Sequence, residues 1–346
     1  MRRDRRRRVV ALRAWPADLA ELSVGVRQRR PEPDGVTSAL ERGDLVRSYA
    51  FRGGSYVFTP EIAAVLLTVR TTSRVWETRR YQAQGGFAID DWEPLRETVR
   101  DLLSTGPKTR AEIAARLDEV ATLRHLAAAA ATGAGSDSLY KPLHWWGDIC
   151  FGPTSSTGRS TFRLLRDDPR WPGLPDVDEA GHRAVELYLA AFGPATIENL
   201  AYWLTEGLSV PRRRVLEWVA ELGSTVSELR IDDVDAYALS VDVEEISAAE
   251  PSDAVRLLPA FDPWVMGPGT ADPRIVPPAR RALVSRGSHV VVHGGVVAGT
   301  WRVQGRVVTV TWFDEAGSAP RSALAEQVRR VGRVRGQELE LAIARS

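Results

Sequence analysis

Apolar residues recur at helical spacing in two short segments of the chain, and each segment begins with a Gly-Pro pair. GPKTRAEIAARL (106–117) and GPATIENLAYWL (193–204) share the pattern G-P-x-T-x-x-[E/N]-[I/L]-A-x-x-L. The apolar positions place one face of each segment against a preceding helix. In each copy the threonine stands where an N-cap belongs, and in the first copy Glu112 completes a capping box. Each copy therefore predicts two helices that meet at a tight corner.

The residues around each corner extend the repeat. The preceding helices are predicted at 92–103 and 179–192, and a third helix at 119–131 and 211–222. Paired β-segments follow, GDICFG with STFRLL in the first copy and SELRI with YALSV around the turn 232–235 in the second. Three helices followed by a β-hairpin is the order of a winged helix. A third copy, without its first helix, is predicted nearer the start, where VTSALERG ends a helix and DLVRSYAF pairs with SYVFT.

The pattern changes after about Val255. The segments RLLPAFD, SHVVVHGG, VVAGTWRVQG and RVVTVTWF are β-rich and separated by glycine turns, and an amphipathic helix (321–331) and a final strand, ELELAI, follow them. We therefore predict an α+β protein of tandem winged-helix modules with a C-terminal β-rich domain. The predicted domains are a shortened first module at 1–85, a second at 86–175, a third at 176–250 and an α/β domain at 251–346.

Composition narrows the class of protein. A chain of 346 residues with one cysteine, Cys150, has no intramolecular disulfide framework and no multi-cysteine zinc site, which fits a reducing cytosol. The start, MRRDRRRRVVALRAWPADLAEL, has a short apolar stretch interrupted by Arg13 and Pro16, so we expect neither a signal peptide nor a membrane span. Its arginine run is either a solvated tail or a phosphate contact. Because the net charge is +1, a nucleic-acid surface would need an uneven charge distribution.

Basic residues at helix starts and wings are the candidates for DNA contact, because winged helices hold a duplex through such positions. The alternative for each is an ordinary surface charge. The C-terminal hairpin that carries Arg302 and Arg306 is either scaffold or a further contact. The candidates are Arg47, Arg52, Lys108, Arg110, Arg159, Arg212, Arg213, Arg214 and Arg302.

The five histidines show no metal-ligand spacing. His289 and His293 fall on one face of a predicted strand, where we expect them to be exposed, and His144 beside two tryptophans is expected to pack in an aromatic cluster. The sequence has no phosphate-binding glycine loop and no serine nucleophile elbow. We expect no metal and no cofactor.

Six motifs occur in one order: LVRSYAFRGGSYVF, GPKTRAEIA, GDICFGP, YLAAFGPATIENLAYWL, LLPAFDPWVMG and VVAGTWR. In this order the chain resembles the AlkZ-like and YcaQ-like winged-helix family, whose members are DNA glycosylases that excise alkylated purines and unhook interstrand crosslinks. The resemblance runs from about Val9 to Ile343. It implies tandem winged helices around a concave DNA channel, with alkylated or crosslinked double-stranded DNA as the partner. We expect a cytoplasmic, nucleoid-associated monomer.

The resemblance also implies a catalytic motif of glutamine, an apolar residue, and glutamine or aspartate near the start of the first module. Counting back from LVRSYAFRGG, the family's L-Q-A-Q-D-P is matched by Leu12-Arg13-Ala14-Trp15-Pro16, which is one residue shorter, so Arg13 and Trp15 replace both polar catalytic residues. The family's histidine after the R-G turn falls on Tyr56, which joins the DNA-contact candidates. MRRDRRRR stands where the family has a helix, which indicates a truncated gene model or a degenerate paralogue. Gln82-Ala83-Gln84 repeats the motif's letters at a different place, before Gly85.

These replacements matter because an alkylated purine is already a cationic leaving group, so the enzyme must stabilise an oxocarbenium-like sugar and position a water. Arg13 would oppose the developing positive charge, and the indole of Trp15 cannot accept a proton. Asp18, with Glu21 beyond it, is either a displaced catalytic carboxylate or one of two solvated carboxylates on a short helix. We therefore hold two hypotheses: a repair-type DNA-binding protein with weak or lost catalysis, and a non-catalytic winged-helix DNA-binding protein or transcriptional regulator.

Overall fold

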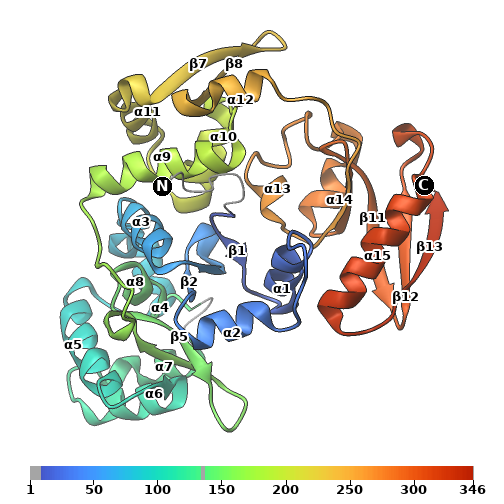
Figure 1. The fold of residues 1–346 in the computed structure, drawn as a ribbon. Helices are drawn as coiled ribbons and strands as arrows, with labels where there is room; N and C mark the ends of the chain where they lie inside the picture. The colour runs from blue at the N-terminus through green and yellow to red at the C-terminus, as the bar shows by residue number, and fades with distance from the viewer. Residues whose placement is uncertain (1–8, 134–136, 346) are drawn as a thin grey trace. The chain divides into compact units, whose positions relative to one another are not determined.

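The computed structural model describes residues 9–133 and 137–345, and its helices and strands are drawn in Figure 1. Helices and sheets are mixed along the chain, which confirms the α+β class. The chain divides into two compact units. Unit 1 comprises Met1–Ala39, Val185–Trp203 and Val219–Ser346, and unit 2 comprises Leu40–Ala184 and Leu204–Trp218. Each unit is built from stretches that are separate in sequence, and the division into four modules stays a prediction.

The start of the described chain has two helices before its first hairpin. After the short strand β1 (Leu12–Arg13) come α1 (Asp18–Gly25) and α2 (Gly35–Glu41). The arginine run at 1–8 lies outside the described residues. In unit 2, β2 (Val46–Tyr49) pairs antiparallel with β3 (Ser55–Phe58), which confirms the hairpin predicted around Arg52. The helices that follow are α3 (Pro60–Thr71), with Thr59 as N-cap, and α4 (Arg79–Gly85).

The first Gly-Pro corner has the predicted element order. Helix α5 (Trp92–Leu103) has the predicted bounds, and Gly106 turns the chain with a φ of +117°, a conformation that favours glycine. The third helix was predicted at 119–131, which is too long. The preceding helix continues to Glu119, a 3-10 turn follows, and the third helix begins only at Ala127. The remaining elements are β4 (Lys108–Thr109), α6 (Arg110–Glu119), α7 (Ala127–Thr132), α8 (Lys141–Trp145) and the antiparallel pair β5 (Ile149–Thr154) and β6 (Ser160–Leu164).

The second corner repeats this order with two departures from the prediction. Asn199 also completes a capping box with Thr196, so both copies have one. The turn between the hairpin strands contains two residues rather than four, since Asp232 and Asp233 both have positive φ and Val234 already pairs with Ile231. The elements are α9 (Val177–Phe192), α10 (Ile197–Ala201), a π-helical turn (Tyr202–Glu206), α11 (Arg212–Glu221), β7 (Val226–Ile231) and β8 (Val234–Leu239).

The two corners are also equivalent in how they meet their hairpins. Lys108 pairs with Phe162 on the second strand of the first hairpin. Ala195, which holds the same position of the repeated pattern, forms two backbone hydrogen bonds with Tyr237 on the second strand of the next hairpin, 2.9 and 2.8 Å long. The sequence repeat is therefore a structural repeat.

The C-terminal part of unit 1 is a five-stranded sheet in the order β13-β12-β11-β10-β9. Its neighbours pair antiparallel except β12 and β13, which are parallel. Helix α15 packs on the sheet through Leu324, Val328 and Val331 (Figure 1). This helix continues past its predicted end to Arg335, before a left-handed Gly336. The strands and short helices here are α12 (Val243–Ser247), β9 (Val255–Leu258), α13 (Pro263–Met266), α14 (Arg281–Ser285), β10 (His289–His293), β11 (Val296–Gln304), β12 (Val307–Trp312), α15 (Arg321–Arg335) and β13 (Glu340–Arg345).

Across the described residues, none of the helices combines the length and apolar character needed to cross a membrane.

Candidate nucleic-acid interface

Three consecutive arginines begin α11 in unit 2, directly after Pro211. The side chain of Arg213 is 87% exposed, and its Nε lies 3.3 Å from the Glu217 carboxylate one helical turn away. Arg212 is also exposed, whereas Arg214 is half-exposed and lies 2.8 Å from the Asp178 carboxylate. Because a helix N-terminus carries a partial positive charge, this end of α11 favours an anion such as a phosphate.

Two hairpin turns of unit 2 also carry exposed arginines. Arg159 is exposed in the β5–β6 loop, where its backbone N–H donates to Ser155. Arg52 lies in the β2–β3 turn with a φ of +51°, and its guanidinium is 3.7 Å from the Glu206 carboxylate. Tyr56 follows on β3 and packs edge-on against Phe51, with ring centroids 5.1 Å apart. Both arginines lie at hairpin ends, the positions from which the wings of winged helices contact phosphates.

Arg47 and Arg110 are instead engaged inside unit 2. The Arg47 guanidinium lies 4.1 Å from the centroid of the Phe151 ring, and burial lowers its pKa. Arg110 donates to both oxygens of Asp137, at 2.7 and 2.8 Å. Lys108 is half-buried in β4. The Arg47 contact joins the first hairpin to the second, and Arg110 holds Asp137, so these side chains are weaker candidates for phosphate contact than the exposed arginines.

Arg302 lies in unit 1, on the C-terminal hairpin. It is exposed on β11 and pairs across the sheet with Thr309 of β12. Arg306 is exposed at the tip of the same hairpin.

The positions aligned with the family's catalytic motif lie on β1 and just after it, in unit 1. Burial alternates here, because Leu12 and Ala14 are buried, Arg13 is half-buried and Trp15 is 69% exposed. The Arg13 guanidinium lies 5.5 Å from the centroid of the Phe261 ring. Arg13 and Trp15 therefore lie on the same side of this segment, opposite Leu12 and Ala14.

The two carboxylates after Trp15 have different surroundings. Glu21 accepts hydrogen bonds from the backbone N–H groups of Val36 and Thr37, at 3.0 and 2.9 Å, and from the Thr37 hydroxyl. It therefore holds the first turn of α2. Asp18 is exposed at the start of α1, with one oxygen 3.4 Å from Arg335. Of the two carboxylates, Asp18 is the one open to a substrate.

A buried carboxylate that the sequence analysis did not assign fixes the position of α1. Asp262 is 1% exposed and accepts from two nitrogens of Arg27, at 2.8 and 2.5 Å, and from the Ser23 hydroxyl at 2.9 Å. It also caps α13 through the Trp264 N–H. An aspartate followed by proline at the start of an apolar segment is an N-cap signal, so the FDPW sequence could have identified the cap but not its partners Ser23 and Arg27.

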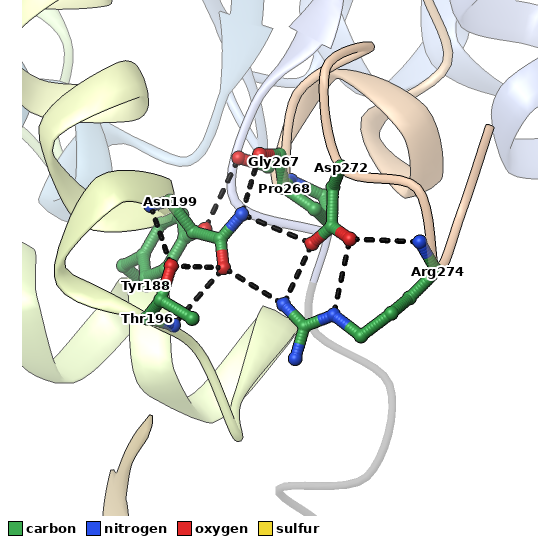
Figure 2. Close-up of polar contacts among 7 residues, drawn as sticks. All are labelled: Tyr188, Thr196, Asn199, Gly267, Pro268, Asp272 and Arg274. Atoms are coloured by element: carbon green, nitrogen blue, oxygen red, sulfur yellow. Dashed lines mark hydrogen bonds and ion pairs between the residues drawn. The ribbon is translucent and has the colours of Figure 1, made fainter. Parts of the chain in front are cut away.

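A second polar network joins α10 to the loop after α13, again within unit 1 (Figure 2). The Asn199 amide donates to the Pro268 carbonyl at 2.8 Å and to Asp272 at 3.1 Å. Arg274 donates to both oxygens of Asp272 and to the Asn199 carbonyl oxygen. Burial alone would raise the pKa of Asp272, but the hydrogen bonds from Arg274 outweigh it and hold that pKa below its usual value. The network satisfies every polar atom of the Asn199 side chain, as expected of a structural rather than a ligand-binding amide.

Three of the five histidines, His144, His289 and His293, occupy packed positions. His144 has no exposed surface, its Nδ1 lies 2.9 Å from the Ser48 hydroxyl, and burial holds its pKa well below the usual value. Its predicted aromatic packing is confirmed by Tyr49 and Phe151, whose ring centroids lie 4.9 and 5.0 Å away. The expected exposure of His289 and His293 is wrong, since both are half-buried and pack against Trp301 and Trp312 respectively.

Gln82, in the sequence that repeats the motif's letters, donates its amide to the Glu77 carbonyl at 2.8 Å. This hydrogen bond joins Gln82 on α4 to the 3-10 turn just before that helix. Within residues 9–133 and 137–345, His, Cys, Asp and Glu side chains form no cluster of three or more that could hold a metal ion.

Repeated helical corners with hairpins and exposed arginines at helix and hairpin ends are typical of a DNA-binding class of protein. The chain belongs to the AlkZ-like DNA glycosylase family, whose statistical model matches residues 7–334. The chain is 30% identical over 335 residues to the interstrand DNA cross-link repair glycosylase of Streptomyces sahachiroi, covering 95% of this chain and 89% of that protein. The solved structure of Streptomyces sahachiroi DNA glycosylase AlkZ superposes with a TM-score of 0.90 at 29% identity, over 96% of this chain and 91% of that one. The resemblance drawn from the order of motifs is confirmed.

Proposed function

We propose that this chain binds double-stranded DNA, with a preference for alkylated or crosslinked duplex, and that its own base excision is weak or lost. The family and the exposed arginines support the binding. The observation that carries the loss of catalysis is the pair Arg13 and Trp15 at the motif positions. We also propose that the protein acts as a monomer associated with the nucleoid in the cytoplasm.

The argument for weak catalysis is electrostatic. Neither Arg13 nor Trp15 can accept a proton from a nucleophilic water, and the guanidinium adds positive charge beside a developing cation. Glu21 cannot replace them, because its carboxylate is occupied by the start of α2. Loss of such acid–base groups typically lowers a rate by about 10²–10⁴.

An excision assay tests this proposal. Purified protein is incubated with duplex containing N7-alkylguanine, and abasic sites are followed in the wild type, in Arg13→Gln with Trp15→Gln, and in Asp18→Asn. We expect little excision by the wild type and a gain in the double variant. Robust wild-type excision that Asp18→Asn abolishes would contradict the proposal and assign the carboxylate to catalysis.

DNA contact by the start of α11 is tested through salt dependence. Removing one arginine–phosphate contact should reduce the slope of log affinity against log salt by about 0.9. Arg213→Ala should therefore flatten the slope, and Arg212→Ala with Arg213→Ala and Arg214→Ala should flatten it further. Arg124→Ala is the matched control, because this arginine is 63% exposed and also lies near one carboxylate. Equal slopes for Arg213→Ala and Arg124→Ala would remove α11 from the interface.

The second candidate function is a non-catalytic DNA-binding protein or transcriptional regulator, which the same altered motif favours. A repair protein should bind alkylated duplex more tightly than unmodified duplex of the same sequence. A regulator should select one sequence from a random pool, usually as a dimer on two half-sites. Selection of bound sequences from a random pool shows whether the protein prefers one sequence. The mass of the protein–DNA complex shows whether it binds as a dimer.

A further inference from the structure

Phe261 has a backbone conformation that its side chain does not favour. Its φ is +58°, in the left-handed region that aromatic residues rarely adopt, and the residue is 36% exposed. Asparagine or glycine would adopt this turn with less strain. The turn conformation therefore gives no reason for an exposed phenyl ring at this position.

The surrounding residues hold the Phe261 ring in place. The Arg13 guanidinium lies 5.5 Å from the ring centroid. A Cβ at Gly287 would come within 2.6 Å of the ring, so the missing side chain there makes room for the phenyl group. The next residue, Asp262, is hydrogen-bonded to Ser23 of α1 and to Arg27 just after this helix. The turn is thus fixed on both sides of a ring that remains partly open to solvent.

Trp15 adds a second exposed ring to the same segment as Arg13. This residue is 69% exposed, and the burial of Leu12 and Ala14 places it on the same side of the chain as the half-buried Arg13. Aromatic rings and arginine planes are the surfaces on which proteins stack unpaired nucleobases, and such stacking needs no particular base sequence. The guanidinium also suits the negative charge of a DNA strand.

We propose that Arg13, Trp15 and Phe261 form a stacking surface for an unpaired nucleobase of the bound DNA. This rests on the proposed function, since it requires that the chain bind duplex. The aligned catalytic positions would then have changed from orienting a water to holding a base that has left the helix. A docking site for another protein is the competing use of the same exposed rings.

Binding to two duplexes tests the stacking surface. One is fully paired, and the other carries a single bulged 5-iodouracil. Trp15→Ala should weaken binding to the bulged duplex by about tenfold and change binding to the paired duplex much less, because one base–aromatic stack is removed. The slope with salt should stay unchanged, since no charge is removed. Val241→Ala is the matched control, because Val241 is also 69% exposed in unit 1.

Phe261→Asn gives a second variant that separates stacking from folding. Asparagine tolerates the left-handed conformation, so the variant should keep the thermal unfolding midpoint of the wild type within a few degrees. It should lose the preference for the bulged duplex as Trp15→Ala does. A stable Phe261→Asn protein with unchanged preference would contradict the proposal.

Photocrosslinking of the iodouracil gives a direct readout. Irradiation of the wild-type complex should link the bulged base to Trp15 or Phe261, identified by mass spectrometry of the peptides. If the wild type binds the duplex but crosslinks only elsewhere, the stacking surface is wrong, protein docking becomes the better use of the rings, and the proposed function stands. If the wild type binds neither duplex, both the proposed function and this inference fail.

Discussion

The two Gly-Pro-x-Thr corners share one local structure and differ in their surroundings. In the first, Glu112 is exposed and accepts from the N–H and hydroxyl of Thr109, at 2.8 and 2.7 Å. In the second, Thr196 and Asn199 are only 8% and 7% exposed, and the Asn199 amide continues into the network with Asp272. The same pattern makes a surface cap in one place and a buried junction in the other.

The change from Glu112 to Asn199 between the copies has a physical reason. A glutamate at the second corner would bring a carboxylate next to that of Asp272, inside the protein. An asparagine keeps the oxygen that caps the helix and adds N–H donors, which reach Asp272 and the Pro268 carbonyl. The residue that suits this position therefore depends on a contact with a distant part of the chain, the loop that contains Pro268 and Asp272.

The largest expected difference between the corners comes from Asn199→Asp, which keeps the shape and replaces the donor by a charged acceptor. The new carboxylate would face both Asp272 and the Pro268 carbonyl. We expect a loss of about 2–4 kcal/mol in the free energy of unfolding at pH 7, measured by urea denaturation. Glu112→Asn at the first corner is the matched variant, with a loss below about 1 kcal/mol. Equal losses would mean that the buried network adds nothing to the local cap.

A smaller effect should appear in the pH dependence of stability. The pKa of Asp272 is lowered in the folded protein, so its ionised form stabilises the fold above the unfolded pKa of about 3.9. This contribution is lost as the pH falls below that value towards the folded pKa. Asp272→Asn should therefore remove part of the acid destabilisation between pH 5 and pH 3.

Urea titrations of the wild type and Asp272→Asn over that pH range provide the measurement. Glu112→Gln is the comparison at the first corner, where the Thr109 N–H and hydroxyl lower the pKa of an exposed carboxylate. Solvent screens the Glu112 carboxylate, so Glu112→Gln should change the pH dependence of stability less than Asp272→Asn does. If the free energy of unfolding falls equally with pH in the wild type and in Asp272→Asn, the assignment of this acid destabilisation to Asp272 is wrong.

The sequence predicts the local structure of both corners well, because capping, apolar spacing and Gly-Pro breaks act within a few residues. The bounds of α5 were correct for that reason. The third helix was predicted to start at 119, whereas α7 starts at Ala127, because the residues between them include no glycine or proline to mark the 3-10 turn. Likewise, the two-residue turn at Asp232 was missed because aspartate in the left-handed region leaves little signal beyond its polarity.

The candidate site was less predictable, because its residues are assembled from distant segments. Arg13 and Trp15 followed from their alignment with a family motif, but their neighbour Phe261 did not, since 248 positions of chain separate it from Arg13. Glu21 was considered as a catalytic carboxylate or a solvated one and instead caps α2, fifteen residues away. Patterns within a helix do not reveal such partners. The exposed arginines of α11 and of the hairpins lie at element ends as predicted, whereas their contact with DNA stays a prediction.

The smallest expected difference between the corners concerns the helix that precedes each of them. The hydroxyl of Tyr188 on α9 donates to the Gly267 carbonyl at 3.1 Å, and the side chain is fully buried. Asp101 holds the equivalent position on α5 and is exposed. Tyr188→Phe leaves one buried carbonyl without this donor, so we expect a loss of about 0.5–1.5 kcal/mol in the free energy of unfolding. Asp101→Asn should cause no measurable change.

Hydrogen exchange locates this small loss. The Gly269 N–H donates to the Val265 carbonyl at 3.0 Å, in the loop that Tyr188 and Asn199 both hold. In Tyr188→Phe its protection should fall by about two- to tenfold, as expected when a local opening becomes easier by the energy of one hydrogen bond. Amides of α6 at the first corner should keep their wild-type rates. Faster exchange at both corners would mean that the two share one cooperative unit, and that the second corner's network is not a separate anchor for its loop.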